Sequence, residues 1–193
     1  MTLIDLLTSK EKKLTKTVNL KKEQILFNEN DVCEYVGIVM SGIITISSFS
    51  FEGNEIVFNK LKSGDVFGNN LIFTKTPFFK GNIIAKTRSQ VVLISKQNLT
   101  QFLQENQAFL EAYLEYQSLF SQSLNTKIKL LSFDSAEERF LYFLYINKNK
   151  IEFDSVTSLA TELFMKRETL SRLISKLIKE KVVDRKNNVI TKI

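Results

Sequence analysis

The side chains best suited to recognition chemistry lie close together near the C-terminus, at Arg167, Glu168, Thr169 and Arg172. Arginine presents a planar fork of donors that matches O6 and N7 of guanine, and glutamate accepts from the amino group of cytosine. Threonine can bond a phosphate or a base edge. This spacing predicts one polar helix face suited to a DNA groove. The alternative is a solvated helix face with ordinary ion pairs, such as Glu168 with Arg172.

A helix with one buried side is needed to position these residues. Apolar residues behind them recur at three- and four-residue spacing, which is typical of such a helix. They are Leu170, Leu173, Ile174, Leu177 and Ile178. A shorter apolar repeat precedes them at Leu159, Ala160 and Leu163, with a break at 164–166. Two helices joined by so short a turn predict a helix-turn-helix whose second helix enters a major groove.

A β-hairpin is predicted directly after the second helix. Residues 182–186 and 189–193 favour strands, and Asn187-Asn188 favours the turn between them. A hairpin in this place predicts a winged helix, with positive charge beside the phosphate backbone. The candidates for backbone contacts are Lys166, Thr169, Lys176, Arg185, Lys186 and Lys192.

The positive charge of the chain is concentrated in this region. The net charge is +6 and the isoelectric point is about 9.3. Residues 166–193 contain nine Lys and Arg residues and three acidic residues, so they hold the whole excess. A local basic cluster on the element predicted to enter the groove is what nucleic-acid binding requires.

Composition excludes several classes of function. The chain has no His, which rules out His-based triads, His-held haem and zinc sites with His ligands. A single cysteine, Cys33, cannot hold an iron–sulfur cluster. No apolar run approaches the roughly 20 residues of a membrane span, and the N-terminal segment, with Asp5, is too acidic for a signal peptide. We expect a cytoplasmic protein that is not an enzyme and has no metal or cofactor.

The first half of the chain predicts a β-rich domain. Leucines suggest a short helix over residues 3–16, and residues 17–95 then follow a period of two, with frequent turn signals. We therefore predict an α+β protein in three parts. These are an N-terminal antiparallel, jelly-roll-like β-roll (1–106), a long dimerisation helix and hinge (107–133), and a C-terminal winged helix-turn-helix (134–193).

The long helix carries a nearly continuous apolar stripe. The stripe comprises Leu110, Tyr113, Leu114, Gln117, Phe120, Leu124 and Ile128. At ~1.5 Å per residue this helix spans ~37 Å, which exceeds what a small roll covers. Self-association along the stripe is the economical explanation, with Gln117 as a polar residue that fixes register. The alternative is that the two domains cover the stripe within one chain.

A family resemblance follows from these residues. Leu-Ala-x-x-Leu, then Arg167-Glu168-Thr169-Leu170-Ser171-Arg172, then Leu-x-x-Leu resembles the recognition helix of the Crp/Fnr family of bacterial transcription regulators. The resemblance implies that Arg167, Glu168 and Arg172 contact bases of a half-site similar to TGTGA. It also implies that the long helix is the dimer interface. Phe164 stands where the family usually has Gly in the turn, and Lys166 where it has a Ser or Thr cap.

The resemblance extends to the predicted roll. Gly64-Asp65-Val66-Phe67-Gly68 is similar to the cyclic-nucleotide-binding roll, in which cyclic-AMP-binding members carry a Glu for the ribose and an Arg-Ser pair for the phosphate. These positions correspond to Asn69, Phe79 and Lys80. Because Phe cannot replace a guanidinium, we predict that cyclic AMP does not bind in the usual way. The candidate effector pocket comprises Phe67, Asn69, Asn70, Phe79 and Lys80.

Cys33 allows two interpretations. A redox-sensing thiol must be exposed and have a lowered pKa, whereas the neighbouring Asp31 and Glu34 would raise it. Free cysteines are usually buried, so we expect a structural role.

Together these features predict a homodimeric transcription regulator that binds inverted repeats in double-stranded DNA. RNA polymerase is a further candidate partner, and a small-molecule effector is unidentified. The alternative is a sensor or adaptor module that uses its roll to bind a ligand or protein and no longer binds DNA specifically. The altered turn, with Phe164 and Lys166, is the feature that favours this alternative.

Overall fold

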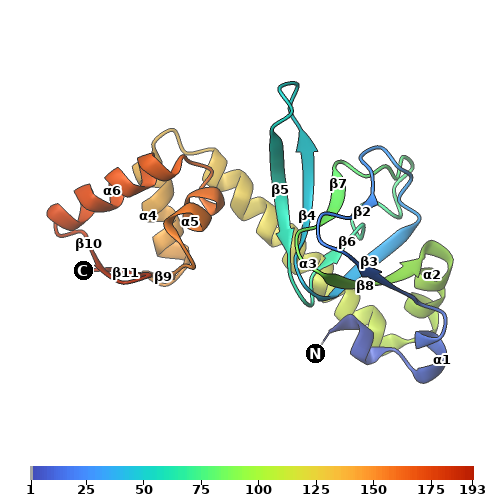
Figure 1. Ribbon diagram of the computed structural model, residues 1–193. Helices are drawn as coiled ribbons and strands as arrows, with labels where there is room; N and C mark the ends of the chain where they lie inside the picture. The colour runs from blue at the N-terminus through green and yellow to red at the C-terminus, as the bar shows by residue number, and fades with distance from the viewer. Residues whose placement is uncertain (1) are drawn as a thin grey trace. The chain divides into compact units, whose positions relative to one another are not determined.

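The computed structural model describes residues 2–193, which form two compact units of mixed α+β structure (Figure 1). The first unit ends at Ser118 and the second starts at Leu119, so the division falls within helix α3 (Gln107–Leu131). Each unit has its own hydrophobic core.

Two four-stranded antiparallel sheets form the first unit. The first sheet has the order β1 (Lys16–Leu20), β8 (Ser89–Ser95), β3 (Tyr35–Ser41), β6 (Val66–Phe67). The second has the order β2 (Ile25–Phe27), β7 (Asn82–Ala85), β4 (Ile44–Phe49), β5 (Glu55–Leu61). The predicted β-roll is therefore confirmed, with β6 as an addition inside the Gly64–Gly68 motif.

Apolar side chains of both sheets meet in one core. Ile38 from β3 and Ile44 from β4 are fully buried there, beside the ring of Phe67. That ring lies against Gly37, where an added Cβ would come within 2.0 Å of it. Glycine at this position of β3 is thus required by close packing rather than by a turn.

The segment over residues 3–16 is not the single helix that its leucines predict. A 3₁₀ helix, η1 (Leu3–Leu6), and a short α1 (Ser9–Lys12) are separated at Leu7, which is extended. The break occurs because the Thr8 hydroxyl accepts from the Glu11 amide and starts a new helix.

Helix α2 (Lys96–Glu105) and the first part of α3 complete the first unit, and both helices begin at side-chain caps. The Ser95 hydroxyl accepts from the Asn98 amide, and Asn106 Oδ1 accepts from the Phe109 amide.

The second unit is a winged helix-turn-helix, as predicted. After the end of α3 it contains α4 (Ala136–Ile146), β9 (Lys150–Glu152), α5 (Val156–Glu162), α6 (Arg167–Lys179), β10 (Val183–Lys186) and β11 (Val189–Lys192). Its antiparallel sheet has the order β10-β11-β9. Phe140, Leu159, Leu170 and Ile190 form the centre of the core. In the described residues, 2–193, no helix has the length and apolar character needed to cross a bilayer.

Candidate nucleic-acid interface

Helix α6 divides sharply into a buried and an exposed face. Leu170, Leu173, Ile174 and Leu177 lie in the core, each no more than 8% exposed. The opposite side of α6 carries only polar and charged residues, apart from Ile178 near its C-terminal end. The apolar spacing therefore fixes which side of the helix packs in the core and which side faces solvent.

The three candidates for base contacts lie on the exposed face. Arg167 is the first residue of α6, Glu168 is the second, and Arg172 follows on the next turn. Within residues 2–193 their side chains form no ion pair, so the alternative pairing of Glu168 with Arg172 is absent from this part of the chain. Their donors and acceptors are available to a partner.

The turn before α6 has an unusual backbone. Phe164 lies in the left-handed region at φ +52°. It occupies the glycine-favouring position of a Schellman motif, in which the Met165 amide donates to Ala160 O (3.0 Å) and the Phe164 amide to Thr161 O (3.1 Å). A side chain in this conformation costs about 1–2 kcal/mol. Lys166, the N-cap of α6, makes no side-chain cap bond, so both departures from the family pattern alter this turn.

Arg139 on α4 supports the same turn, a role that the sequence pattern does not indicate. Its Nη1 donates to Leu163 O (3.2 Å) and Phe164 O (2.9 Å), and its Nη2 donates to Phe133 O (3.0 Å). The available signal is the only arginine of α4, which follows two glutamates and precedes an apolar run, and spacing alone does not reveal its partners.

Four of the candidates for DNA backbone contacts have little intramolecular ion pairing that would compete with a DNA phosphate. Lys166, Thr169 and Lys192 are exposed. Lys186 is also exposed, and its Nζ lies 3.9 Å from Asp184 Oδ2, which is a loose ion pair. Ion pairs at this exposure are weak.

The other two backbone-contact candidates have intramolecular partners. Lys176 Nζ lies 2.7 Å from Glu137 Oε2 on α4, and this hydrogen bond raises the pKa of Lys176. Arg185 Nε donates to Asn187 O (2.9 Å) at the tip of the hairpin. The bond to Glu137 offsets the charge of Lys176, which makes it the weakest of the six candidates for a phosphate contact.

The candidate effector pocket is largely filled with side chains, which corrects the prediction for Phe67 and Phe79. Both are 2% exposed and pack in the core of the roll. The ring of Phe27 stacks on Phe79 at 4.9 Å between centroids and meets the edge of Phe67 at 6.5 Å. These rings are core residues, because the interior of the roll buries its largest apolar groups. Asn70 and Lys80 are exposed.

Asn69 and α3 form a compact polar contact, here named the α3 clamp. Asn69 Nδ2 donates to Gln117 Oε1, Gln117 Nε2 donates to Asn69 O (3.0 Å), and the Tyr113 hydroxyl donates to Asn69 O (3.4 Å). Tyr116 exchanges two further bonds with the backbone of Val66. Burial raises the pKa of Tyr113 to about 12.

The α3 clamp corrects two residues of the predicted dimer interface. Tyr113 is buried and Gln117 is bonded within the same chain, so neither faces outward as the stripe implied. Leu114, Leu124 and Ile128 are 40–62% exposed. Exposure of the remaining stripe residues, Leu110 and Phe120, is intermediate.

Cys33 is buried and does not have the properties of a sensor thiol. It is 1% exposed, and its Sγ lies 3.4 Å from Tyr35 O and 3.7 Å from Gly68 O. Burial raises its pKa to about 11, which keeps the thiol protonated and unreactive. The structural interpretation of Cys33 fits this environment.

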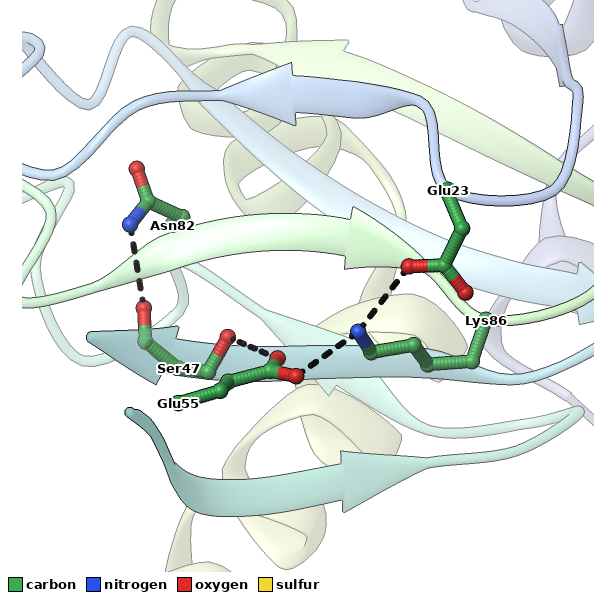
Figure 2. Close-up of polar contacts among 5 residues, drawn as sticks. All are labelled: Glu23, Ser47, Glu55, Asn82 and Lys86. Atoms are coloured by element: carbon green, nitrogen blue, oxygen red, sulfur yellow. Dashed lines mark hydrogen bonds and ion pairs between the residues drawn. The ribbon is translucent and has the colours of Figure 1, made fainter. Parts of the chain in front are cut away.

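A polar network links four segments of the second sheet (Figure 2). Lys86, just after β7, places its Nζ 2.9 Å from Glu55 Oε2 on β5 and 3.1 Å from Glu23 Oε2 before β2. The Ser47 hydroxyl on β4 donates to Glu55 Oε1 (2.6 Å), and Asn82 Nδ2 donates to Ser47 O (3.3 Å). Because these residues lie far apart in the chain, spacing did not predict the network.

The β4–β5 hairpin exposes large apolar side chains. Phe49, Phe51, Ile56, Val57 and Phe58 are all at least 42% exposed. β5 is also the last strand of its sheet. An apolar edge strand of this kind is normally covered by a partner.

Comparison with known proteins identifies a family match within the first unit and one curated relative. Residues 17–106 match the cyclic nucleotide-binding domain family. The chain is 23% identical over 129 residues to the anaerobic regulatory protein of Bacillus subtilis, a match that covers 65% of this chain and 54% of that protein. The chain thus spans about half the length of this relative.

Two solved structures share the fold over nearly the whole chain. A variant of CooA from Carboxydothermus hydrogenoformans superposes with a TM-score of 0.75 at 21% identity, over 100% of this chain and 91% of that chain. The catabolite activator protein of Thermus thermophilus gives 0.57 at 17% identity, over 99% and 93%. At these identities the similarity establishes the fold, including the long helix and the winged unit.

Proposed function

We propose that the chain is a transcription regulator of the Crp/Fnr family that binds DNA sequence-specifically as a homodimer. The observation that carries this proposal is the exposure of Arg167, Glu168 and Arg172 at the start of a helix whose other face is buried. The N-terminal turns of such a helix usually reach the base edges.

Each set of residues has a distinct role in this proposal. Arg167, Glu168 and Arg172 select the sequence, whereas Lys166, Thr169, Lys186 and Lys192 fix register through the phosphates. Two winged units, one from each copy, would contact an inverted repeat in successive major grooves. DNA as the partner places this activity in the cytoplasm of a bacterium, with RNA polymerase as the second macromolecule involved.

The first test is a gel-shift titration with an inverted repeat of TGTGA half-sites and with a scrambled duplex. We expect specific binding by the wild type. Arg167→Ala should weaken it by about 1–3 kcal/mol and relax the preference at one base pair, because a bidentate contact to guanine is lost. Arg88→Ala is the matched control, since Arg88 is exposed in the first unit. Equal losses on both duplexes would contradict base recognition by Arg167.

We further propose that cyclic AMP is not the effector. Phe79 is buried where a cation would have to hold the cyclic phosphate, and its ring is stacked on Phe27. A phosphate requires charged or hydrogen-bonding groups around it. Calorimetric titration with cyclic AMP up to the millimolar range should give no saturable heat, and the nucleotide should leave the gel shift unchanged. Saturable binding would overturn this proposal.

A second candidate function is protein binding through the roll without specific DNA binding. The exposed apolar residues of the β4–β5 hairpin favour it, because such a surface usually has a partner. The gel shift separates the two candidates. A protein that shows no preference for the inverted repeat over the scrambled duplex would have the adaptor function.

A further inference from the structure

The guanidinium of Arg139 connects two neighbouring backbone carbonyls, of Leu163 and Phe164, with that of Phe133, which lies far from them in the chain. Nη1 donates to Leu163 O (3.2 Å) and Phe164 O (2.9 Å), and Nη2 donates to Phe133 O (3.0 Å). Nε is enclosed and has no partner within residues 2–193. The planar fork lets one side chain reach two groups of acceptors at once, which a lysine ammonium does not match.

Two of these carbonyls lie at the end of α5, where acceptors need partners. The Schellman bonds satisfy Ala160 O and Thr161 O, and Arg139 supplies donors to two further carbonyls beyond the end of α5, those of Leu163 and Phe164. The C-terminal end of a helix is also its negative end, so a cation is favoured there. Arg139 thereby holds the strained, positive-φ conformation of Phe164 from outside the turn.

The third carbonyl ties the turn to the connection between α3 and α4. Phe133 follows the end of α3, and its ring packs on Tyr142 of α4 at 5.1 Å between centroids. Lys129, in the last turn of α3, lies 4.6 Å over the ring of the same Tyr142. Arg139 and this cluster therefore join the end of α3 to the residues that immediately precede α6, all within the second unit.

We propose that Arg139 is a positioning residue that fixes the α5–α6 turn against the α3–α4 connection and so sets how α6 is presented to DNA. The inference rests on the proposed DNA-binding function. It does not require Arg139 to contact DNA. It predicts that specific DNA binding depends on Arg139 because Phe164 has a strained, positive φ. Glycine at position 164 would adopt the same φ without strain and would need less external support.

The test is a double-mutant cycle of Arg139→Lys and Phe164→Gly, with Arg88→Lys as the control for the arginine-to-lysine change. Arg139→Lys should weaken binding to the inverted repeat about tenfold, as expected for the loss of a charge-assisted hydrogen bond, and should change binding to the scrambled duplex less than twofold. The loss should shrink to about threefold or less when Phe164→Gly is present. The control variant should bind like the wild type.

Amide hydrogen exchange supplies a readout that needs no DNA. In Arg139→Lys, the Phe164 and Met165 amides should exchange about tenfold faster, because their Schellman bonds open more often. The amides of the roll should not change. Unchanged exchange at both amides, or additive effects in the cycle, would overturn the role of Arg139. Failure of the wild type to prefer the inverted repeat would instead contradict the proposed function and leave the exchange test to decide the role of Arg139.

Discussion

Among single residues, exposure decides which positive charges on the winged unit can meet a phosphate. Lys186 near the hairpin turn is 87% exposed, and its nearest carboxylate oxygen, on Asp184, is 3.9 Å away. Lys176 is held at 2.7 Å from Glu137 and must give up this bond to reach DNA. Surface ion pairs contribute little in water, so Lys186 keeps nearly its whole charge for a polyanion.

Lys186→Ala should therefore weaken binding to every duplex alike. Loss of one phosphate contact lowers the slope of log K against log salt by about one unit, because one fewer counterion is released. The slope is obtained from fluorescence anisotropy titrations on specific and scrambled duplexes. Lys75→Ala in the first unit is the matched control, since Lys75 is exposed but lies outside the winged unit. A loss confined to the inverted repeat would show that Lys186 contacts bases instead.

Between elements, the network in Figure 2 ties the hairpin strand β5 to the rest of its sheet. Hydrogen bonds from Ser47 and Lys86 lower the pKa of Glu55 below its usual 4.5, and the bond to Glu55 raises the pKa of Lys86 above its usual 10.5. The stability from Glu55 is present above pH 4.5 and is lost as pH falls through its lowered pKa. The stability from Lys86 is present below pH 10.5 and is lost as pH rises through its raised pKa.

Glu55→Gln should therefore lower the stability of the roll only within this pH window. At pH 7 we expect a loss of about 1 kcal/mol, because the amide still accepts from Ser47 but no longer attracts Lys86. As pH falls through the lowered pKa of Glu55, the difference from the wild type should vanish. Urea unfolding at several pH values measures the free energy of unfolding at neutral pH and its change at low pH. Glu52→Gln in the same hairpin is the control. A constant difference at all pH values would show that charge is not the cause.

In the whole molecule, the exposed part of the α3 stripe is the best site for a second copy. Leu114, Leu124 and Ile128 recur at heptad spacing on one side of the helix and are 40–62% exposed. The α3 clamp leaves these residues on the open side, since it bonds Tyr113 and Gln117 within the chain. A symmetric pair along this strip would bury them and duplicate the winged unit.

Ile128→Glu should prevent the proposed dimer from forming, because pairing would bury an unpaired carboxylate from each copy in an apolar interface. Sedimentation equilibrium measures the change, and affinity for the inverted repeat should fall to that for a single half-site. Gln122→Glu adds the same charge to an exposed position of α3 away from the strip and is the control. An unchanged sedimentation profile in Ile128→Glu would place the dimer interface elsewhere or show a monomer.

Local patterns were sufficient for most of the fold. Helix α6 and its buried face follow from a 3.6-residue apolar period, and the caps at Ser95, Asn106 and Ser155 follow from side chains that each bond the amide three residues on. These interactions join residues within about one helical turn, so neighbouring residues in the sequence are enough to predict them. The same reasoning failed at residues 3–16, where the Thr8 cap outweighed the leucine pattern.

Contacts between distant residues decided the rest. Periodicity placed Tyr113 and Gln117 on the same stripe as Ile128. Only the fold shows that Tyr113 and Gln117 donate hydrogen bonds to Asn69 O. Packing likewise made core residues of Phe67 and Phe79. Arg139, whose carbonyl partners lie 6 to 25 residues away, had no signal in its neighbours. The sequence by itself determined which side chains are apolar or charged. The tertiary structure decided which of them are already buried or hydrogen-bonded within the chain, because both depend on which distant residues the fold brings together.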